Sequence, residues 1–394
     1  MNILLIGYWS IHEGLTQSTI IPHLRILSEM DKVEHIIFVS IERKEMYQPI
    51  NINNPKIIHT PLHSKNVKLK FINKWLDFTL FPTKLKDIIK NNNIELCIGV
   101  GTQAGTLAHK ASASFNIPFI VSFYDPHASY MQALGVWKKY DLRYLLLSLW
   151  ENQLKIRARY IFPVSNRYYK TLIQDGVDIK RLKTVPCTTD LEHFEIDLNE
   201  GKSIRKELNW DEKDLVGVYV GKFGDIYFYE EAFNLFSLLK KRFPVLKLII
   251  LTGQDKLIIS SQLINAGFSE KDFFVSYTSH CKVPDFLNAS NFAFCLHKPH
   301  YISYAYSPIK NGEYWACGLP VIIPDGIGDD SQILKETGLG VVMEDIEQPE
   351  KYFPQLEKLI QANKKEEIRQ LAIKYRNPEI TRRTYQKIIS ELCR

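Results

Sequence analysis

The sequence has few cysteines and no long apolar run. Its six cysteines among 394 residues are scattered, without the spacing of a metal or redox site. No run approaches the roughly 20 apolar residues that a membrane-spanning helix needs. The start, MNILLIGYWS, has no basic region or cleavage site of a signal peptide, and no Asp-x-Asp triplet follows an expected strand. We therefore expect a cytoplasmic protein with no disulfide framework, no membrane span and no essential metal.

What is present is the composition of a soluble globular protein. Hydrophobic residues make up 45% and charged residues 24%, and the net charge is +6. This basic excess is too small for a nucleic-acid-binding tail, but it suits phosphorylated substrates or an anionic membrane surface. A chain of 394 residues is too long for one core, so it predicts two domains.

Short apolar runs alternate with longer amphipathic stretches, which is typical of a parallel α/β sheet. The expected strands are residues 2–7, 35–40, 95–101, 118–124 and 160–165, followed by 215–224, 246–253, 272–278, 291–297 and 320–325. We predict two Rossmann-like, doubly wound domains that face each other across a cleft. The first spans 1–195, the second spans 196–375, and a helix at 376–394 packs back on the first.

The stretch SPIKNGEYWACGLPVIIPDG, residues 307–326, combines charges with a helix start. Ser307 and Pro308 favour the beginning of a helix, where exposed N–H groups attract anions. Lys310 and Glu313 are three residues apart, so they lie on one helical face. Their spacing fits either a surface salt bridge or a site in which the carboxylate binds two adjacent hydroxyls and the lysine binds phosphate.

This stretch resembles the donor-binding signature of the GT-B glycosyltransferases of the family-4 retaining kind. The segments IFPVSNRYYKTLIQDGVDIKRLKTVPCTTDLEHF, VYVGKFG and VSYTSHCKVPDFLNASNFAFCLH resemble further parts of that family, in the same order. The resemblance covers most of the chain and is most specific in its second half. It implies a GT-B fold and a retaining, metal-independent transferase of the hexosyltransferase type. Its substrate would be a nucleotide-diphosphate sugar, with no other cofactor.

The resemblance also implies roles for particular residues. Glu313 would hold the ribose hydroxyls, and Lys222, after Gly221, would contact the diphosphate. Ser307, Pro308 and Lys310 would lie near phosphate, and Tyr277 and Thr278 would border the base. A solvated position for Lys222 and simple packing for Tyr277 are the alternatives.

Two positions depart from the family pattern. Tyr227 stands where the family commonly has a second lysine, and Ala305 stands where it usually has a further acidic residue. One contact to phosphate and one to the transferred sugar are therefore in question. The donor base, UDP or GDP, and the donor sugar stay open.

The first half contributes weaker candidates. Asp125 and His127 follow an expected strand, where the family often has a histidine beside the transferred sugar. Together with Lys222 they are the predicted catalytic residues, although His127 fits a structural loop equally well. Gly14, with His12 and Glu13, matches the family's N-terminal glycine loop loosely and is predicted to face the acceptor.

Two basic and aromatic segments, 64–90 and 136–160, are candidates for contact with the acceptor. In the second, one apolar stripe recurs at helical spacing: Tyr140, Tyr144, Leu147, Trp150 and Leu154. The stripe fits either a core-facing helix or a surface that lies on a membrane. The second reading favours a lipid-carrier-linked glycan as the acceptor, in the synthesis of a surface polysaccharide. The protein would then associate with the inner face of the membrane, without a nucleic-acid partner.

Two other functions fit the same residues. A nucleotide-sugar epimerase shares the fold but would turn over without an acceptor. A glycosyltransferase-like module without activity would bind nucleotide sugar weakly and serve as a partner in an assembly; the departures at Tyr227 and Ala305 favour it. The acceptor, the linkage and the oligomeric state are not specified by the sequence.

Overall fold

The computed structural model describes residues 1–43, 47–65 and 70–393. The chain forms two compact units: unit 1 contains Met1–Cys187 and Pro378–Arg394, and unit 2 contains Thr188–Asn377. Part of the basic and aromatic segment at 64–90, residues 66–69, lies outside the described residues. The acceptor and donor roles that the sequence assigns to the two domains stay predictions.

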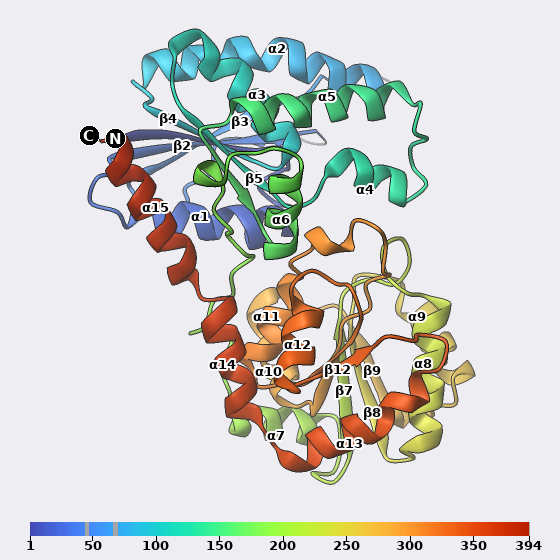
Figure 1. Cartoon of the computed structure of the whole chain (residues 1–394). Helices are drawn as coiled ribbons and strands as arrows, with labels where there is room; N and C mark the ends of the chain where they lie inside the picture. The colour runs from blue at the N-terminus through green and yellow to red at the C-terminus, as the bar shows by residue number, and fades with distance from the viewer. Residues whose placement is uncertain (44–46, 66–69, 394) are drawn as a thin grey trace. The chain divides into compact units, whose positions relative to one another are not determined.

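Unit 1 is built around a six-stranded parallel sheet (Figure 1). Its strands run in the order β3 (Ile57–His63), β2 (His35–Glu42), β1 (Asn2–Gly7), β4 (Leu96–Val100), β5 (Phe119–Phe123) and β6 (Tyr160–Pro163). Its helices are α1 (Ile21–Ser28), α2 (Lys70–Asn91), α3 (Thr102–Ser112), α4 (His127–Ala133), α5 (Leu142–Arg157), α6 (Asn166–Gln174) and α15 (Pro378–Leu392). Helices α2, α3 and α5 cover one face, and α1 and α15 the other. The central strands are buried on both sides, so they read as continuous apolar runs.

Unit 2 repeats this topology. Its parallel strands run in the order β9 (Phe273–Ser276), β8 (Leu246–Leu251), β7 (Leu215–Val220), β10 (Phe292–Phe294), β11 (Val321–Pro324) and β12 (Val341–Met343). Its helices are α7 (Leu198–Glu207), α8 (Glu230–Arg242), α9 (Lys256–Asn265), α10 (Val283–Asn288), α11 (Ile309–Ala316), α12 (Asp330–Thr337), α13 (Phe353–Ala362) and α14 (Lys365–Tyr375). In this Rossmann order, the direction in which successive strands are added to the sheet reverses beside β1 and beside β7. Open sheets bind ligands at such points, at the carboxyl ends of the strands.

All ten strands expected from the sequence are present, and two were missed. The missed strands, β3 and β12, are the outermost strands of their sheets. The sequence of β3, IIHTPLH, mixes polar residues with apolar ones because part of the strand is exposed. Strand β12 has only three residues, which is too short to give a periodic signal. The prediction of two doubly wound α/β domains is confirmed.

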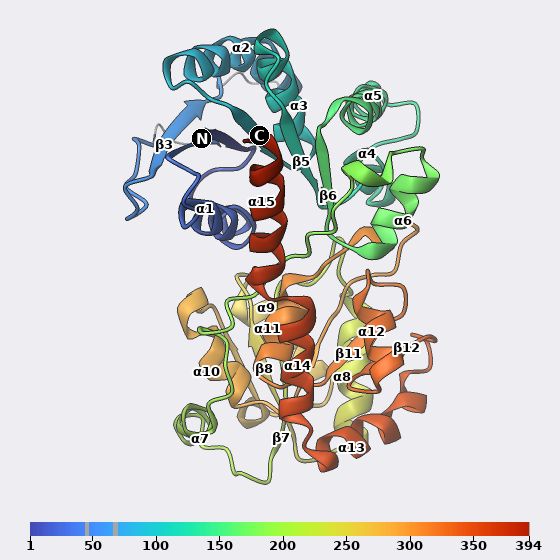
Figure 2. The same cartoon turned by 60° about the vertical axis from the view of Figure 1, so that its left-hand side comes forward.

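The C-terminal helix packs on unit 1, as predicted (Figure 2). Tyr385 is fully buried in α15, and its hydroxyl lies 2.9 Å from Nδ1 of His23 in α1. Ile388 and Ile389 belong to the same core as the strands β1 and β2. The Tyr160 hydroxyl donates a hydrogen bond to Glu391 near the end of the helix. Chain segments from both ends of the sequence therefore share one hydrophobic core.

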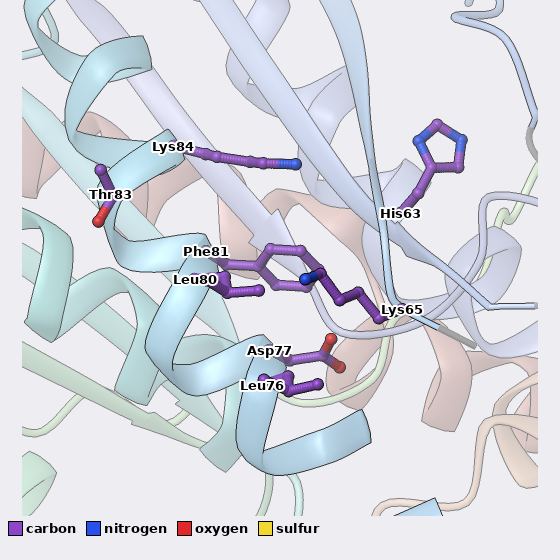
Figure 3. Close-up of a pocket in the computed structure, with 8 residues that line it drawn as sticks. All are labelled: His63, Lys65, Leu76, Asp77, Leu80, Phe81, Thr83 and Lys84. Carbon is purple, nitrogen blue, oxygen red and sulfur yellow. The ribbon is translucent and has the colours of Figure 1, made fainter. Parts of the chain in front are cut away.

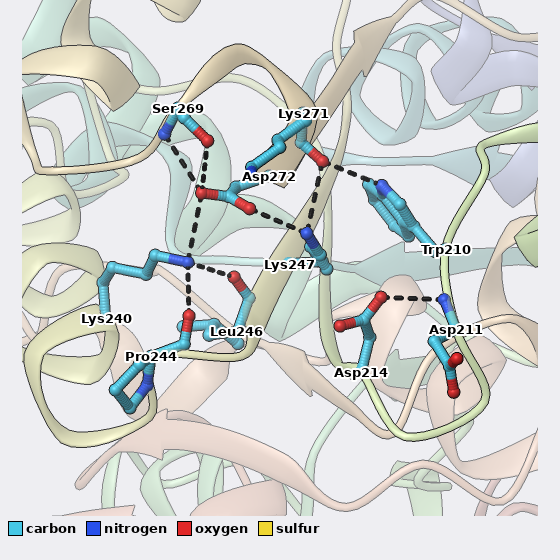
Figure 4. Close-up of polar contacts among 10 residues, drawn as sticks. All are labelled: Trp210, Asp211, Asp214, Lys240, Pro244, Leu246, Lys247, Ser269, Lys271 and Asp272. Carbon is cyan, nitrogen blue, oxygen red and sulfur yellow. Dashed lines mark hydrogen bonds and ion pairs between the residues drawn. The ribbon is translucent and has the colours of Figure 1, made fainter.

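A buried cluster of charges anchors the β8–β9 edge of unit 2 (Figure 4). The Asp272 carboxylate accepts hydrogen bonds from Lys247 Nζ at 2.7 Å and Ser269 Oγ at 2.7 Å, and Lys240 Nζ lies at 3.2 Å. Burial raises the pKa of Asp272, but the hydrogen bonds from these partners lower it by a larger amount. The pKa of Asp272 therefore lies well below its usual range. The carboxylate is fully engaged in holding the fold together, so we assign this cluster no chemical role.

Candidate functional site

In unit 2, the loop after β7 carries Gly221 and Lys222 at the carboxyl end of a central strand. The loop is held by Gln254, whose side chain accepts from Phe223 N at 2.6 Å and donates to Phe223 O at 3.1 Å. The Lys222 ammonium lies 2.6 Å from Asp225 and its side chain is half exposed. Lys222 is therefore mobile enough to contact an anion, but it must first leave this carboxylate.

Helix α11 follows β10, the strand paired with β7, and begins after a turn that contains Ser307 and Pro308. Pro308 occupies the N-cap position, and no side chain caps the helix. The Ser307 hydroxyl instead accepts a hydrogen bond from the Arg376 guanidinium. The expectation that Ser307 caps the helix is therefore wrong, because a buried arginine engages its side chain. The N–H groups of the first turn have no intrahelical acceptor, and they form a potential anion site together with the helix dipole.

The arginine belongs to a buried network that supports this turn. Arg376 also pairs with Asp330 in α12, and Asp330 accepts from the Asn311 side chain at 2.7 Å. All three side chains are buried. Gly312 fits against this network closely, since a Cβ atom there would lie 2.3 Å from Thr189 Oγ1. The start of α11 is thus held rigidly, as a site that must position a ligand requires.

Glu313 and Lys310 contact each other on α11, and a third residue joins them. Lys310 Nζ lies 3.3 Å from Glu313 Oε2, and His280 Nε2 lies 3.0 Å from Glu313 Oε1. Glu313 is only 2% exposed. Burial raises its pKa, but Lys310 and His280 lower it by more, so the pKa of Glu313 lies below its ordinary value. The carboxylate is ionised at neutral pH and can accept hydrogen bonds from a diol.

This buried carboxylate is more than a surface salt bridge, because its partners are more exposed than it is. The Lys310 side chain is 38% exposed and that of His280 is 58% exposed, against 2% for Glu313. His280 was not a predicted site residue. It lies within the quoted segment VSYTSHCKVPDFLNASNFAFCLH, but it comes close to Glu313 only through the fold.

Tyr277 and Thr278 follow β9, beside the loop after β8 that contains Gly253. The Tyr277 side chain is 79% exposed, so it is not a core residue. A Cβ atom on Gly253 would lie 3.9 Å from its ring, which places the ring over this glycine. Thr278 is half-buried beside it. The exposed ring can stack on a planar base.

The two departures from the family pattern take different forms in the structure. Tyr227 packs against His297 with ring centroids 4.6 Å apart and the rings tilted by 55°, and burial raises the pKa of Tyr227 to about 12. Burial also lowers the pKa of His297 to about 4, so both rings are neutral. Ala305 is fully buried in the turn before α11. An uncharged aromatic pair thus stands where a lysine would be expected, and the basic groups of this site are Lys222 and Lys310.

In unit 1, Asp125 and His127 lie together at the carboxyl end of β5. His127 begins α4, and its Nδ1 atom lies 3.3 Å from the Asp125 carboxylate. Both side chains are about a quarter exposed. The carboxylate orients the imidazole. The pair can donate a hydrogen bond to a sugar hydroxyl or phosphate.

A buried glutamate holds the segment that carries this pair. Glu151 in α5 accepts from Ala128 N at 3.1 Å and from the Thr102 hydroxyl at 3.3 Å. Burial raises its pKa to about 7, although the Ala128 N–H and His127 act to lower it. Glu151 was not a predicted site residue, since it lies on a helix of ordinary amphipathic pattern.

The loop with His12, Glu13 and Gly14 follows β1 and is organised by Glu42. Glu42 is buried at the end of β2 and accepts from Ile11 N at 3.0 Å. Glu13 Oε1 accepts a hydrogen bond from Ser10 N at 3.4 Å, and His12 packs against Tyr47 with ring centroids 4.2 Å apart and the rings tilted. Gly14 has open space around it and no left-handed backbone, so nothing in the structure requires glycine there.

Four of the five residues in the apolar stripe expected in 136–160 are buried or half-buried, whereas Tyr140, which precedes α5, is 86% exposed. Leu147 and Leu154 of α5 are buried, and Trp150 packs on Phe78 of α2 with centroids 4.3 Å apart. The opposite face of α5 exposes large apolar side chains instead. They are Leu142, Leu145, Leu149 and Ile156, each between 44% and 69% exposed. The interfacial reading of the predicted stripe is therefore wrong, because helical periodicity does not say which of two apolar faces is covered.

Within 1–43, 47–65 and 70–393, no cluster of three or more His, Cys, Asp or Glu side chains is arranged to hold a metal ion. In the same part of the chain, no helix has the length and apolar character to span a bilayer.

The chain thus combines two compact Rossmann-like units, and the second carries basic and carboxylate side chains at the start of a helix. Residues 201–375 match the model of the family described as glycosyl transferases group 1. No curated protein sequence matches the chain. Many solved structures do, at low identity.

Three solved structures illustrate the match. Sucrose-phosphate synthase (tll1590) from Thermosynechococcus elongatus gives a TM-score of 0.74 at 16% identity, over 99% of this chain and 98% of that chain. Anabaena Alr3699/HepE in complex with UDP-glucose gives 0.69 at 13%, over 99% and 100%. WaaG, a glycosyltransferase involved in lipopolysaccharide biosynthesis, gives 0.67 at 13%, over 96% and 98%. These likenesses show the GT-B fold.

The chain has the GT-B fold, and its residues 201–375 are similar to the group 1 glycosyl transferases. The resemblance to the family-4 retaining enzymes is consistent with this assignment.

Proposed function

We propose that this glycosyltransferase moves a sugar, with retention of configuration, from a UDP- or GDP-linked donor to a glycan on a lipid carrier. The observation that carries the donor half is the ionised, buried Glu313 beside Lys310 at the rigid start of α11. A carboxylate in this state binds two adjacent hydroxyls well, and a ribose presents such a pair. The solved complex of HepE with UDP-glucose has the same fold, which supports a nucleotide sugar of this kind.

The remaining groups would act on the leaving diphosphate. Lys222, Lys310 and the first N–H groups of α11 supply positive charge where negative charge develops as the bond between the sugar and phosphate breaks. The acceptor hydroxyl would attack the anomeric carbon on the leaving-group face and pass its proton to the departing phosphate oxygen. His127, oriented by Asp125, would hydrogen-bond the transferred sugar. The loop with His12, Glu13 and Gly14 would face the acceptor.

The proposed lipid-linked acceptor requires contact with a membrane, and we assign this contact to the exposed face of α5. Its apolar side chains lie between basic residues, Lys138 and Lys139 before the helix and Arg157 and Arg159 at its end. An apolar strip with basic flanks binds the interface of an anionic bilayer. Liposome flotation tests this contact. The double variant Leu145→Gln/Leu149→Gln should lose binding to anionic vesicles, whereas Leu257→Gln, at an 80% exposed position in unit 2, should keep it.

The function itself is tested by turnover. The purified chain is incubated with UDP- and GDP-hexoses, with and without a dodecyl-diphosphate-linked monosaccharide, and the products are analysed by mass spectrometry and NMR. We expect a disaccharide that keeps the donor's anomeric configuration, formed only with acceptor. A changed sugar nucleotide without acceptor would identify an epimerase instead. Binding of nucleotide sugar with no turnover would identify an inactive binding module.

A further inference from the structure

A cavity of about 420 Å³ lies in unit 1 between the end of β3 and helix α2 (Figure 3). Its size is that of sites for small molecules. His63, the last residue of β3, lies at its rim, so the cavity opens at the carboxyl edge of the parallel sheet. Ligands bind at this edge in open α/β sheets. Most of the lining belongs to the basic and aromatic segment 64–90, and the cavity contains none of the residues of the candidate donor site.

The charge in the cavity is predominantly positive. Lys65 and Lys84 line it from opposite elements, and neither makes an ion pair with any described residue. The one carboxylate, Asp77, is 2% exposed and already has partners. Ser64 donates to it at 2.7 Å and Tyr8 at 2.9 Å, and a guanidinium nitrogen of Arg43 lies at 3.8 Å. Asp77 therefore holds the wall together, and the two lysines are left for an anionic ligand.

Helix α2 supplies the rest of the lining. Leu76, Leu80 and Phe81 form its apolar part, and Thr83 adds one hydroxyl. Figure 3 shows the Phe81 ring and the Lys65 and Lys84 side chains directed into the same space. Leu80 is 39% exposed, and the neighbouring Trp75 on the same helix is 55% exposed. An exposed tryptophan and leucine beside lysines are typical of contact with an amphiphile, whose charged end and aliphatic end need different partners.

We propose that this cavity binds the phosphate end of a long-chain lipid phosphate or diphosphate. The phosphate would lie between Lys65 and Lys84, and the first carbons of the chain would lie on Leu76, Leu80 and Phe81. This inference rests on the proposed function and specifies where the carrier part of the acceptor is held. It places the anchor of the acceptor on α2 and at the end of β3.

Calorimetry with three probes tests the proposal: dodecyl phosphate below its critical micelle concentration, inorganic phosphate and dodecyl maltoside. We expect dodecyl phosphate to bind most tightly. The double variant Lys65→Gln/Lys84→Gln and the variant Leu80→Gln should each weaken it at least tenfold. Lys170→Gln, an exposed lysine of α6, is the control and should not. Equal binding of inorganic phosphate would show an anion site only. Equal binding of dodecyl maltoside would show an apolar site only, and either result overturns the proposal.

Kinetics separates this proposal from the proposed function. With the dodecyl-diphosphate-linked acceptor, the double lysine variant should raise the KM for acceptor at least tenfold and leave the KM for the nucleotide sugar unchanged. If transfer occurs and the acceptor KM does not change, the cavity is not the carrier site, although the transferase function holds. If no transfer occurs with any protein, the transferase function fails, and the binding of dodecyl phosphate alone decides the role of the cavity.

Discussion

Glu151→Gln should make the stability of unit 1 less dependent on pH. Glu151 is buried, and both of its hydrogen-bond donors, Ala128 N and the Thr102 hydroxyl, can also donate to a glutamine oxygen. Burial raises the pKa of Glu151 in the folded chain from 4.5 to about 7. The substitution keeps the shape and removes the titration, so the difference between the two proteins reports the buried charge.

The sign follows from the raised pKa. Below pH 4.5 the carboxyl is neutral in both the folded and the unfolded chain, so the full stability is present. As the pH rises to about 7, the unfolded chain ionises first and the folded chain loses stability; above that pH the loss is constant. Each unit of pKa shift corresponds to about 1.4 kcal/mol, so the loss amounts to about 3 kcal/mol. The glutamine variant should gain this amount relative to the native chain between pH 4.5 and pH 8.

Urea denaturation at pH 4.5, 6, 7 and 8, followed by hydrogen exchange of peptides from α5, measures the effect in unit 1 specifically. The charged groups that act on Glu151, namely Asp125, His127 and Lys155, are present in both proteins. Glu207→Gln, at an exposed position in α7, is the control and should show a constant difference. A stability difference for Glu151→Gln that does not change with pH would refute the reasoning.

Three further predictions concern unit 2 and its comparison with unit 1. Gly312→Ala should lower the stability of the folded chain by about 1–3 kcal/mol, because the added Cβ overpacks a buried network. Gly14→Ala adds a Cβ in open space, so thermal denaturation should show it to be neutral or stabilising. Equal effects of the two substitutions would contradict the packing argument. Asp225→Asn should release Lys222 and tighten UDP binding a few fold, and Lys222→Gln should weaken it about tenfold, as calorimetry would show; unchanged affinities would remove the lysine from the site. Tyr227→Lys should lower the melting temperature without tightening UDP binding, since it buries a charge in an aromatic pair; tighter binding would contradict this account.

Much of the fold could be predicted because buried parallel strands are continuous apolar runs. Residues 2–7 and 246–251 are buried almost throughout, and their sequences, NILLIG and LKLIIL, show it directly. Strand β3 could not be found in this way, since its half-exposed edge position admits His, Thr and Pro. The apolar pattern of α5 was recognised, but its orientation depends on which neighbour covers it, and here α2 covers the face with Trp150.

The candidate site, like the fold, has one part that the sequence predicts and one part that it does not. The neighbourhood of Lys310 and Glu313 was predictable, because a spacing of three on a helix brings two side chains together. The contact of His280 with Glu313 was not, since it joins residues 33 positions apart on different elements. The same holds for Glu151, which reaches Ala128 and Thr102 only after three segments have assembled at one sheet edge.

Binding of nucleoside diphosphates tests the central claim most directly. Calorimetry would compare UDP, GDP and CMP on the native chain, on Glu313→Gln and Glu313→Ala, and on the exposed control Glu207→Gln. We expect one diphosphate to bind the native chain and the control equally, and both Glu313 variants to bind it about 10- to 100-fold more weakly, as the loss of charge-assisted hydrogen bonds requires. Binding that survives both substitutions of Glu313 would contradict the account of α11 as the donor site.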